Sequence, residues 1–122
     1  MRPFVRMEGT LTTIPLSIYR ADAFLSELHS RANPFSEYTL SQEKDGAGKT
    51  TYRVSVLGKG EYDEDALSEF LSTVTFWLAE GEIKFLPISG CNPVLWRIQL
   101  RGYHWYKDEA EIVYVNGTDP IV

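Results

Sequence analysis

The chain has 122 residues, 43% of them hydrophobic and 24% charged, which are ordinary values for one globular domain, so we expect a single domain over residues 1–122. A net charge of −5 argues against nonspecific binding to nucleic acid, because that binding depends on clustered Lys and Arg. One cysteine, Cys91, excludes an intrachain disulfide. With neither a signal-peptide pattern at the amino terminus nor an apolar stretch of membrane-spanning length, these features predict a cytoplasmic protein.

The first forty residues predict a strand followed by a helix. Residues Phe4 to Ile14 alternate loosely and are rich in strand formers. Apolar residues then recur at helical spacing, which predicts a helix from Pro15 to about Arg31 with Thr13 as its cap.

A hairpin is predicted next. Residues 37–41 and 51–56 alternate between apolar and polar side chains, and the turn formers of 45–48 lie between them.

The second helix has the strongest local signals. Asp63 is a favourable N-cap, and Glu64 and Asp65 place negative charge in the first turn, where the helix dipole favours it. We expect this helix to end at Gly81. Its apolar residues form one stripe: Leu67, Phe70, Leu71, Val74, Trp77 and Leu78.

Three further strands are expected at Glu82–Ile88, at Val94–Arg101 (or onward to Tyr106) and at Glu109–Val115. The turns between them are expected at residues 89–93 and 107–108. The resulting order, β-α-β-β-α-β-β-β, predicts an α+β fold with a ferredoxin-like antiparallel sheet and two helices on one face.

No catalytic or metal-binding pattern is present in the sequence. The two histidines, His29 and His104, are far from each other and from Cys91, and there is no closely spaced Cys/His set for a metal. We therefore expect a protein that is not an enzyme and that carries no cofactor or metal.

Two groups of residues are candidate protein-binding contacts. The first is acidic and contains no Lys or Arg: Glu61, Asp63, Glu64, Asp65 and Glu69. Helix capping also accounts for several of these carboxylates, but such a row can bind a basic cleft in place of nucleic acid.

The second group is aromatic: Tyr103, Trp105 and Tyr106. These residues lie near the last predicted hairpin, where little chain remains to cover them, and we expect Arg97 and Arg101 on the opposite face of the strand. Exposed aromatic residues are enriched at recognition surfaces. The alternative is that they complete the packing of the sheet, as expected for Trp77 and Trp96.

The segments Asp63–Leu71, Gly81–Phe85 and Leu95–Ile98 resemble small uncharacterised bacterial and phage-type α+β proteins. The resemblance covers less than half of the chain and rests on packing residues, so it implies a fold and a setting but carries no catalytic residue. Small acidic phage proteins of this size are often inhibitors of host defence, such as anti-CRISPR proteins.

The sequence therefore predicts a non-enzymatic interaction module, of which a phage or mobile-element inhibitor of a host nucleic-acid-processing complex is the favoured form. Its expected partner is a protein, with no direct contact to nucleic acid or membrane. Two alternatives stay open. One is a small-ligand binder or enzyme that uses the sheet face or the Cys91 loop, and the other is a self-assembling protein, such as a homodimer, paired through its last hairpin.

Overall fold

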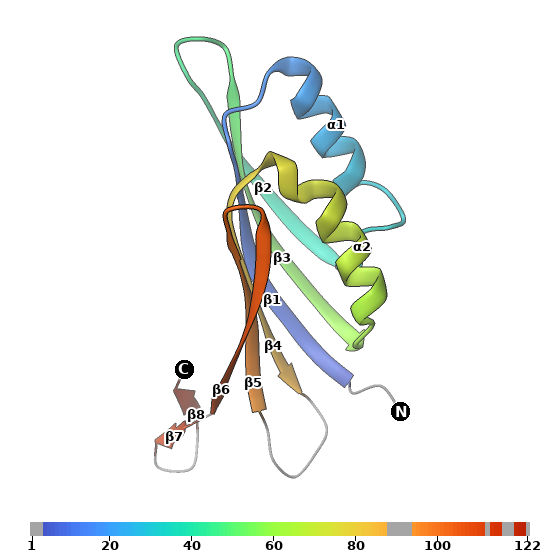
Figure 1. The fold of residues 1–122 in the computed structure, drawn as a ribbon, viewed down its shortest axis with the longest axis vertical. Helices are drawn as coiled ribbons and strands as arrows, with labels where there is room; N and C mark the ends of the chain where they lie inside the picture. Colours follow the sequence, from blue (N-terminus) through green and yellow to red (C-terminus); the bar gives the residue numbers. More distant parts are fainter. Residues whose placement is uncertain (1–3, 88–93, 112, 116–118, 122) are drawn as a thin grey trace.

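The computed structural model describes residues 4–87, 94–111, 113–115 and 119–121 (Figure 1). The elements are, in chain order, β1 (Phe4–Thr13), α1 (Ile18–Leu28), β2 (Glu37–Lys44), β3 (Thr50–Glu61), α2 (Glu64–Val74), the 3₁₀ turn η1 (Thr75–Trp77), β4 (Leu78–Pro87), β5 (Val94–Arg101), β6 (His104–Glu111), β7 (Val113–Val115) and β8 (Asp119–Ile121).

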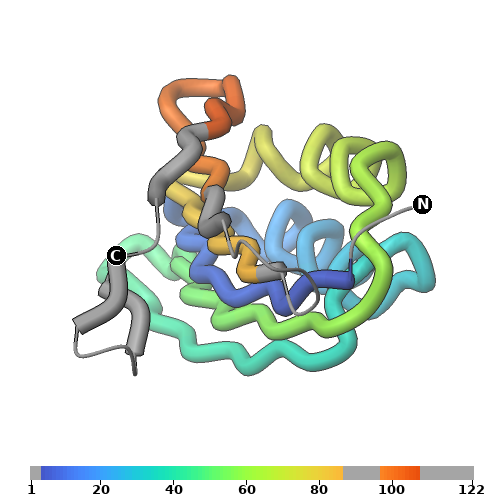
Figure 2. Tube along the Cα trace, turned by 90° about the horizontal axis from the view of Figure 1, so that it is seen from below, coloured from blue at the N-terminus to red at the C-terminus, as the bar shows by residue number. Residues whose placement is uncertain are grey.

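Six strands form one antiparallel sheet in the order β2-β3-β1-β4-β5-β6, and β7 and β8 form a separate hairpin. Helix α1 connects β1 to β2, and α2 connects β3 to β4, so β1 lies in the centre between β3 and β4. This is the split β-α-β arrangement of ferredoxin-like folds, extended by the β5–β6 hairpin. Both helices cover the same face of the sheet, which confirms the predicted fold class (Figures 1 and 2).

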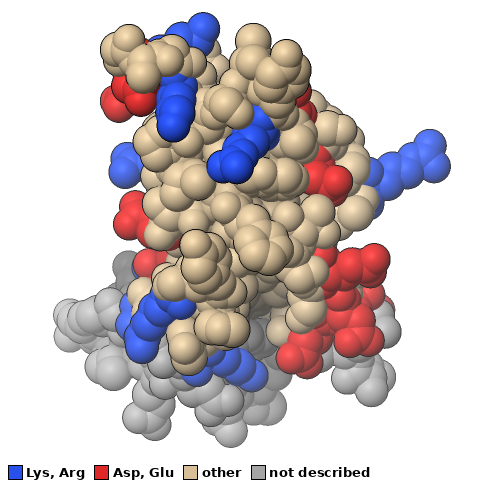
Figure 3. All heavy atoms as spheres, turned by 45° about the horizontal axis from the view of Figure 1, so that its top comes forward, with Lys and Arg blue, Asp and Glu red and all other residues tan. Residues whose placement is uncertain are grey.

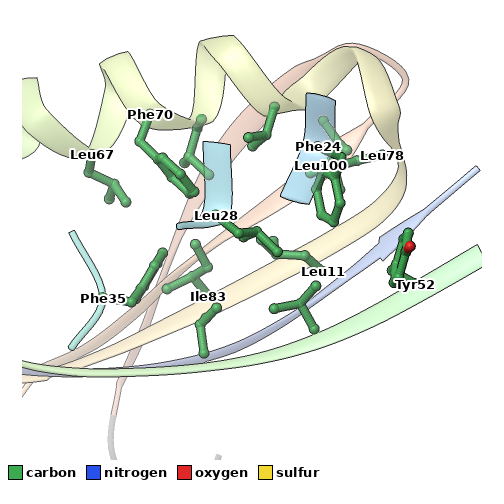
Figure 4. Packing of buried hydrophobic residues seen from close by; sticks show 14 of the residues in the cluster. Leu11, Phe24, Leu28, Phe35, Tyr52, Leu67, Phe70, Leu78, Ile83 and Leu100 are labelled. Atoms are coloured by element: carbon green, nitrogen blue, oxygen red, sulfur yellow. The ribbon is translucent and has the colours of Figure 1, made fainter. Parts of the chain in front are cut away.

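The core lies between this sheet face and the helices (Figure 4). Alternate residues of β1 and β3 point toward the helices, which is why Leu11 and Val54 are fully buried. From the helix layer, Phe24 of α1 and Phe70 of α2 meet them. The opposite sheet face is uncovered by helices (Figure 2).

The start of α1 differs from the expectation. Its cap is Ser17, not Thr13, because the chain first forms a bridge in which the backbones of Leu16 and Thr50 exchange hydrogen bonds of 2.8 and 2.9 Å. Thr13 is buried, and its hydroxyl accepts a hydrogen bond from the Tyr52 N–H at 2.9 Å.

The prediction that α2 ends at Gly81 is wrong. The helix ends at Val74, and after η1 the chain enters β4 at Leu78, where the register between β1 and β4 shifts. Gly81 lies inside β4. The apolar stripe therefore continues from a helix into a turn and a strand, and the half-buried Trp77 packs edge-on against Phe24.

The predicted turn at residues 107–108 is also wrong. The chain reverses earlier, at Gly102, whose φ of +64° suits glycine, and β6 passes straight through residues 107–108. The predicted strand Glu109–Val115 is accordingly divided between β6 and β7. The turn at residues 89–93, including Cys91, and the side chain of Trp96 lie outside the described residues.

Candidate protein-binding surface

Helix α2 presents a face of carboxylates to solvent. Asp63 caps the helix, since its Oδ1 accepts a hydrogen bond from the Ala66 N–H at 3.1 Å. Leu67 and Phe70 are buried against the sheet, so Glu64, Asp65 and Glu69 are left exposed on the other side. Figure 3 shows acidic side chains gathered over the beginning of α2, next to an uncharged area.

The β5–β6 hairpin is anchored beside α2 by Trp105. The indole Nε1 donates a hydrogen bond to the Thr75 hydroxyl at 2.9 Å, and that hydroxyl in turn donates to the carbonyl of Leu71. The indole ring packs on Gly81, where a Cβ atom would lie only 2.6 Å from the Trp105 ring. Gly81 is therefore needed to admit this tryptophan, not to end a helix.

A groove with a volume of about 470 Å³ runs between α2 and this hairpin. Its walls are formed on one side by Glu64, Leu67, Ser68, Leu71, Ser72, Thr75 and Phe76, and on the other by Ile98, Tyr103, His104, Trp105 and Lys107, with Tyr62 also lining it. The groove thus joins the acidic helix to the aromatic hairpin in one surface.

Phe76 and Tyr103 form the aromatic end of this groove. Their side chains are 71% and 70% exposed, and their rings contact each other with centroids 6.2 Å apart. Two large aromatic rings held together in solvent provide apolar area that a partner can bury.

Tyr62 lines the groove near the acidic beginning of α2. Its ring packs edge-on against Phe85, with centroids 5.4 Å apart. Burial raises the pKa of the Tyr62 phenol above its ordinary value of 10.0, and the negative charge of Glu64 raises it further. The phenol is therefore neutral and able to donate a hydrogen bond at physiological pH.

The structure brings together three of the predicted contacts, Glu64, Tyr103 and Trp105, around the groove. Trp105 is half-buried and serves as an anchor of the hairpin, with Tyr103 exposed beside it. Among the other predicted acidic residues, Glu61 lies exposed at the end of β3.

Tyr106 is separated from the other two aromatic residues. Successive residues of a strand point to opposite faces, so Tyr106 lies on the open face of the sheet while Trp105 faces the helices. The Arg101 guanidinium lies 5.5 Å from the centre of the Tyr106 ring. Arg101 and Tyr106 therefore share the open face of the sheet, and Leu100 of the same strand as Arg101 points to the helix side.

Phe76 was not predicted as a site residue. It falls outside the apolar stripe of the second helix, between Val74 and Trp77, and an aromatic residue outside the buried stripe is the signal that identifies it.

The open sheet face carries a second hollow of about 680 Å³. Hydroxyls of Thr10, Thr12 and Ser55 line it together with Arg53 and Glu82. The Glu82 carboxylate is 3.5 Å from the Arg97 guanidinium. Within the described part of the chain, no group of three or more His, Cys, Asp or Glu is arranged to hold a metal ion.

Comparisons with known proteins identify no family. No family model and no curated protein matches the chain. Among solved structures, the chain is similar to LarC2, the C-terminal domain of a cyclometallase involved in the synthesis of the NPN cofactor of lactate racemase, in its apo form. The identity is 6% and the TM-score 0.43, over 87% of this chain and 78% of that one. Within the described residues, no helix has the length and apolar character needed to cross a membrane.

Proposed function

We propose that this protein is a non-enzymatic interaction module that binds a basic protein partner through the groove between α2 and the β5–β6 hairpin. The supporting observation is the joining of two features in one surface. One wall begins with Glu64, next to the exposed Asp65 and Glu69 of α2, a helix without Lys or Arg. Lys107 lies on the other wall, and the far end presents the exposed Phe76–Tyr103 pair.

The two parts of the surface have different roles in binding. Carboxylates at the rim steer a positively charged partner and raise the association rate, whereas buried aromatic anchors supply most of the affinity. A partner segment that suits both parts carries Lys or Arg beside a large apolar side chain.

Proteins that process nucleic acid have basic clefts of this kind. We therefore propose, as the narrower form of this function, an inhibitor of a host nucleic-acid-processing defence complex that competes with nucleic acid for such a cleft, in the manner of anti-CRISPR proteins. The length and the net charge of −5 are compatible with this form.

The test is a pull-down of the tagged chain from bacterial lysates that contain defence complexes, with and without nuclease, read by mass spectrometry. A stoichiometric partner that survives nuclease is expected. The variant Glu64→Gln/Asp65→Asn/Glu69→Gln should lose most of that partner, because it removes Glu64, which lines the groove, and the two exposed carboxylates next to it on α2.

The matched control is Asp22→Asn/Glu27→Gln/Glu80→Gln, which removes the same charge from α1 and β4, at positions that lie neither on α2 nor in the lining of the groove. It should capture the partner as the wild type does. Equal loss in both variants would show that only net charge matters and would contradict the proposed surface.

A further inference from the structure

Strand β2 forms one edge of the sheet, and its outer side is not paired by any described strand. The side chains of residues 39–44 are exposed on both faces, and even Leu40 is 39% exposed. Its neighbour β3, by contrast, alternates between buried and exposed residues. Residues 39–44 of β2 therefore extend past the helix layer. Both of their faces and their outer edge are exposed to solvent.

The backbone groups that point outward from β2 can be identified. Thr50 exchanges both of its backbone hydrogen bonds with Leu16, so its opposite residue, Lys44, directs its own N–H and C=O away from β3. Hydrogen-bonded and non-hydrogen-bonded pairs alternate along an antiparallel ladder. The outward groups are therefore those of Tyr38, Leu40, Gln42 and Lys44.

Two of the usual protections of an edge strand are absent from β2, and its charged residues, Glu37, Glu43 and Lys44, lie only at its two ends, so residues 38–42 carry no charge. Its sequence contains no proline, and its register with β3 is unbroken from Glu37 to Lys44, so there is no bulge to turn the edge away. Natural proteins protect exposed edges with such features because an unprotected edge pairs with another strand. An open edge of eight residues is long enough for a stable ladder.

We propose that two copies of this chain pair antiparallel through β2, which gives one continuous sheet with six strands from each copy. This site differs from the one under "Proposed function", because β2 lies at the opposite edge of the sheet from the β5–β6 hairpin. A second copy can occupy this edge, because a two-fold axis between two identical β2 strands places the outward groups of both copies opposite one another.

The register of the two paired β2 strands follows from the requirement that their outward backbone groups lie opposite one another and from the positions of the charged residues. Centred on Ser41, the ladder pairs Tyr38 with Lys44 and Leu40 with Gln42 and uses all four outward residues of each copy. It opposes no like charges within residues 38–44, and the Glu37–Asp45 pairs that it also creates lie at the two ends of the ladder, with Asp45 outside β2. Centred on Leu40, the ladder would place Glu37 opposite Glu43 twice, which is unfavourable. Centred on Thr39, it would use only the first two outward residues.

Disulfide trapping tests this register in a Cys91→Ser background. Ser41→Cys places two thiols directly opposite at a non-hydrogen-bonded pair, where Cβ atoms are about 4.5–5.5 Å apart. Thr39→Cys, on the same face and also exposed, leaves the two thiols about 13 Å apart along the strands. We expect a linked dimer from Ser41→Cys on mild oxidation and at least tenfold less from Thr39→Cys. Equal linking of both variants, or more from Thr39→Cys, would overturn the register.

The mass of the purified chain in solution tests the pairing itself. We expect the mass to rise from one copy toward two with concentration, and more readily at high salt, which screens the charge of −5 on each copy. Leu40→Pro removes an outward N–H and no internal bond, so it should fold with an unchanged circular dichroism spectrum and remain a monomer. A wild-type chain that is monomeric at every concentration and salt would overturn the proposal.

Discussion

Replacing Gly81 by alanine should destabilise the protein through the packing of Trp105. The added Cβ would lie 2.6 Å from the Trp105 ring and 3.2 Å from Leu11 Cδ2, so the indole must move. Overpacking of this kind costs about 1–3 kcal/mol. Displacement of the indole also weakens its hydrogen bond to Thr75, worth about 1 kcal/mol.

A gain opposes these costs, because alanine in a strand is favoured over glycine by about 0.5–1 kcal/mol. The expected net loss in the free energy of unfolding is therefore about 1–3 kcal/mol. For a chain of 122 residues, each kcal/mol lowers Tm by roughly 4 °C. The measurement is urea and thermal unfolding, followed by tryptophan fluorescence.

The matched control is Gly60→Ala. Gly60 is also a strand glycine, but no heavy atom lies within 4 Å of the position that its Cβ would take. It should be as stable as the wild type or up to about 1 kcal/mol more stable. If Gly81→Ala were as stable as Gly60→Ala, the Trp105–Gly81 contact that forms the groove would not exist as described.

Four further substitutions have predicted effects on stability. Gly9→Ala should cost more than Gly81→Ala, since its Cβ would lie 2.3 Å from the Glu82 carbonyl oxygen in a neighbouring backbone that cannot rotate away; equal unfolding midpoints in urea would contradict this. Asp63→Ala should lower the free energy of unfolding by about 1 kcal/mol, and Ser17→Ala by less, because the Ser17 Oγ is a long 3.5 Å from the Arg20 N–H. Tyr62 has a raised pKa in the folded state, so its contribution to stability is complete below the unfolded pKa near 10 and is lost as pH rises through the folded pKa. Wild type should lose more stability than Tyr62→Phe between pH 9 and pH 11.5 in urea unfolding, and parallel losses would contradict the assignment.

Much of the fold is predictable from local signals. The alternation of β1 and the capped, amphipathic α2 depend on neighbouring residues alone, and with the hairpin at residues 45–48 they are sufficient for the ferredoxin-like order. The end of α2 is not predictable in this way. The apolar stripe through Trp77 and Leu78 is continuous in the sequence, but the pairing of β4 with β1 takes Leu78 into a strand. A tertiary contact thus overrides the helical period.

The candidate surface is also predictable from local signals only in part. The carboxylates of α2 are predictable because capping and helix-dipole effects are local. The exposure of Phe76 and the burial of Trp105 depend on where the β5–β6 hairpin turns, and that turn is fixed by Gly102 and by the space above Gly81. Neither distance along the sequence nor residue type reveals that η1, with Phe76, meets the β5–β6 hairpin, with Tyr103 and Trp105.

The most direct test of the central claim is the dissociation constant of the captured partner for the variant Phe76→Ala/Tyr103→Ala. The groove surface predicts a loss of at least about thirtyfold, the effect of removing an aromatic anchor worth about 2 kcal/mol. Unfolding in urea should change little, because both side chains are exposed. A partner that binds this variant as tightly as the wild type would show that the groove between α2 and the β5–β6 hairpin is not the binding site.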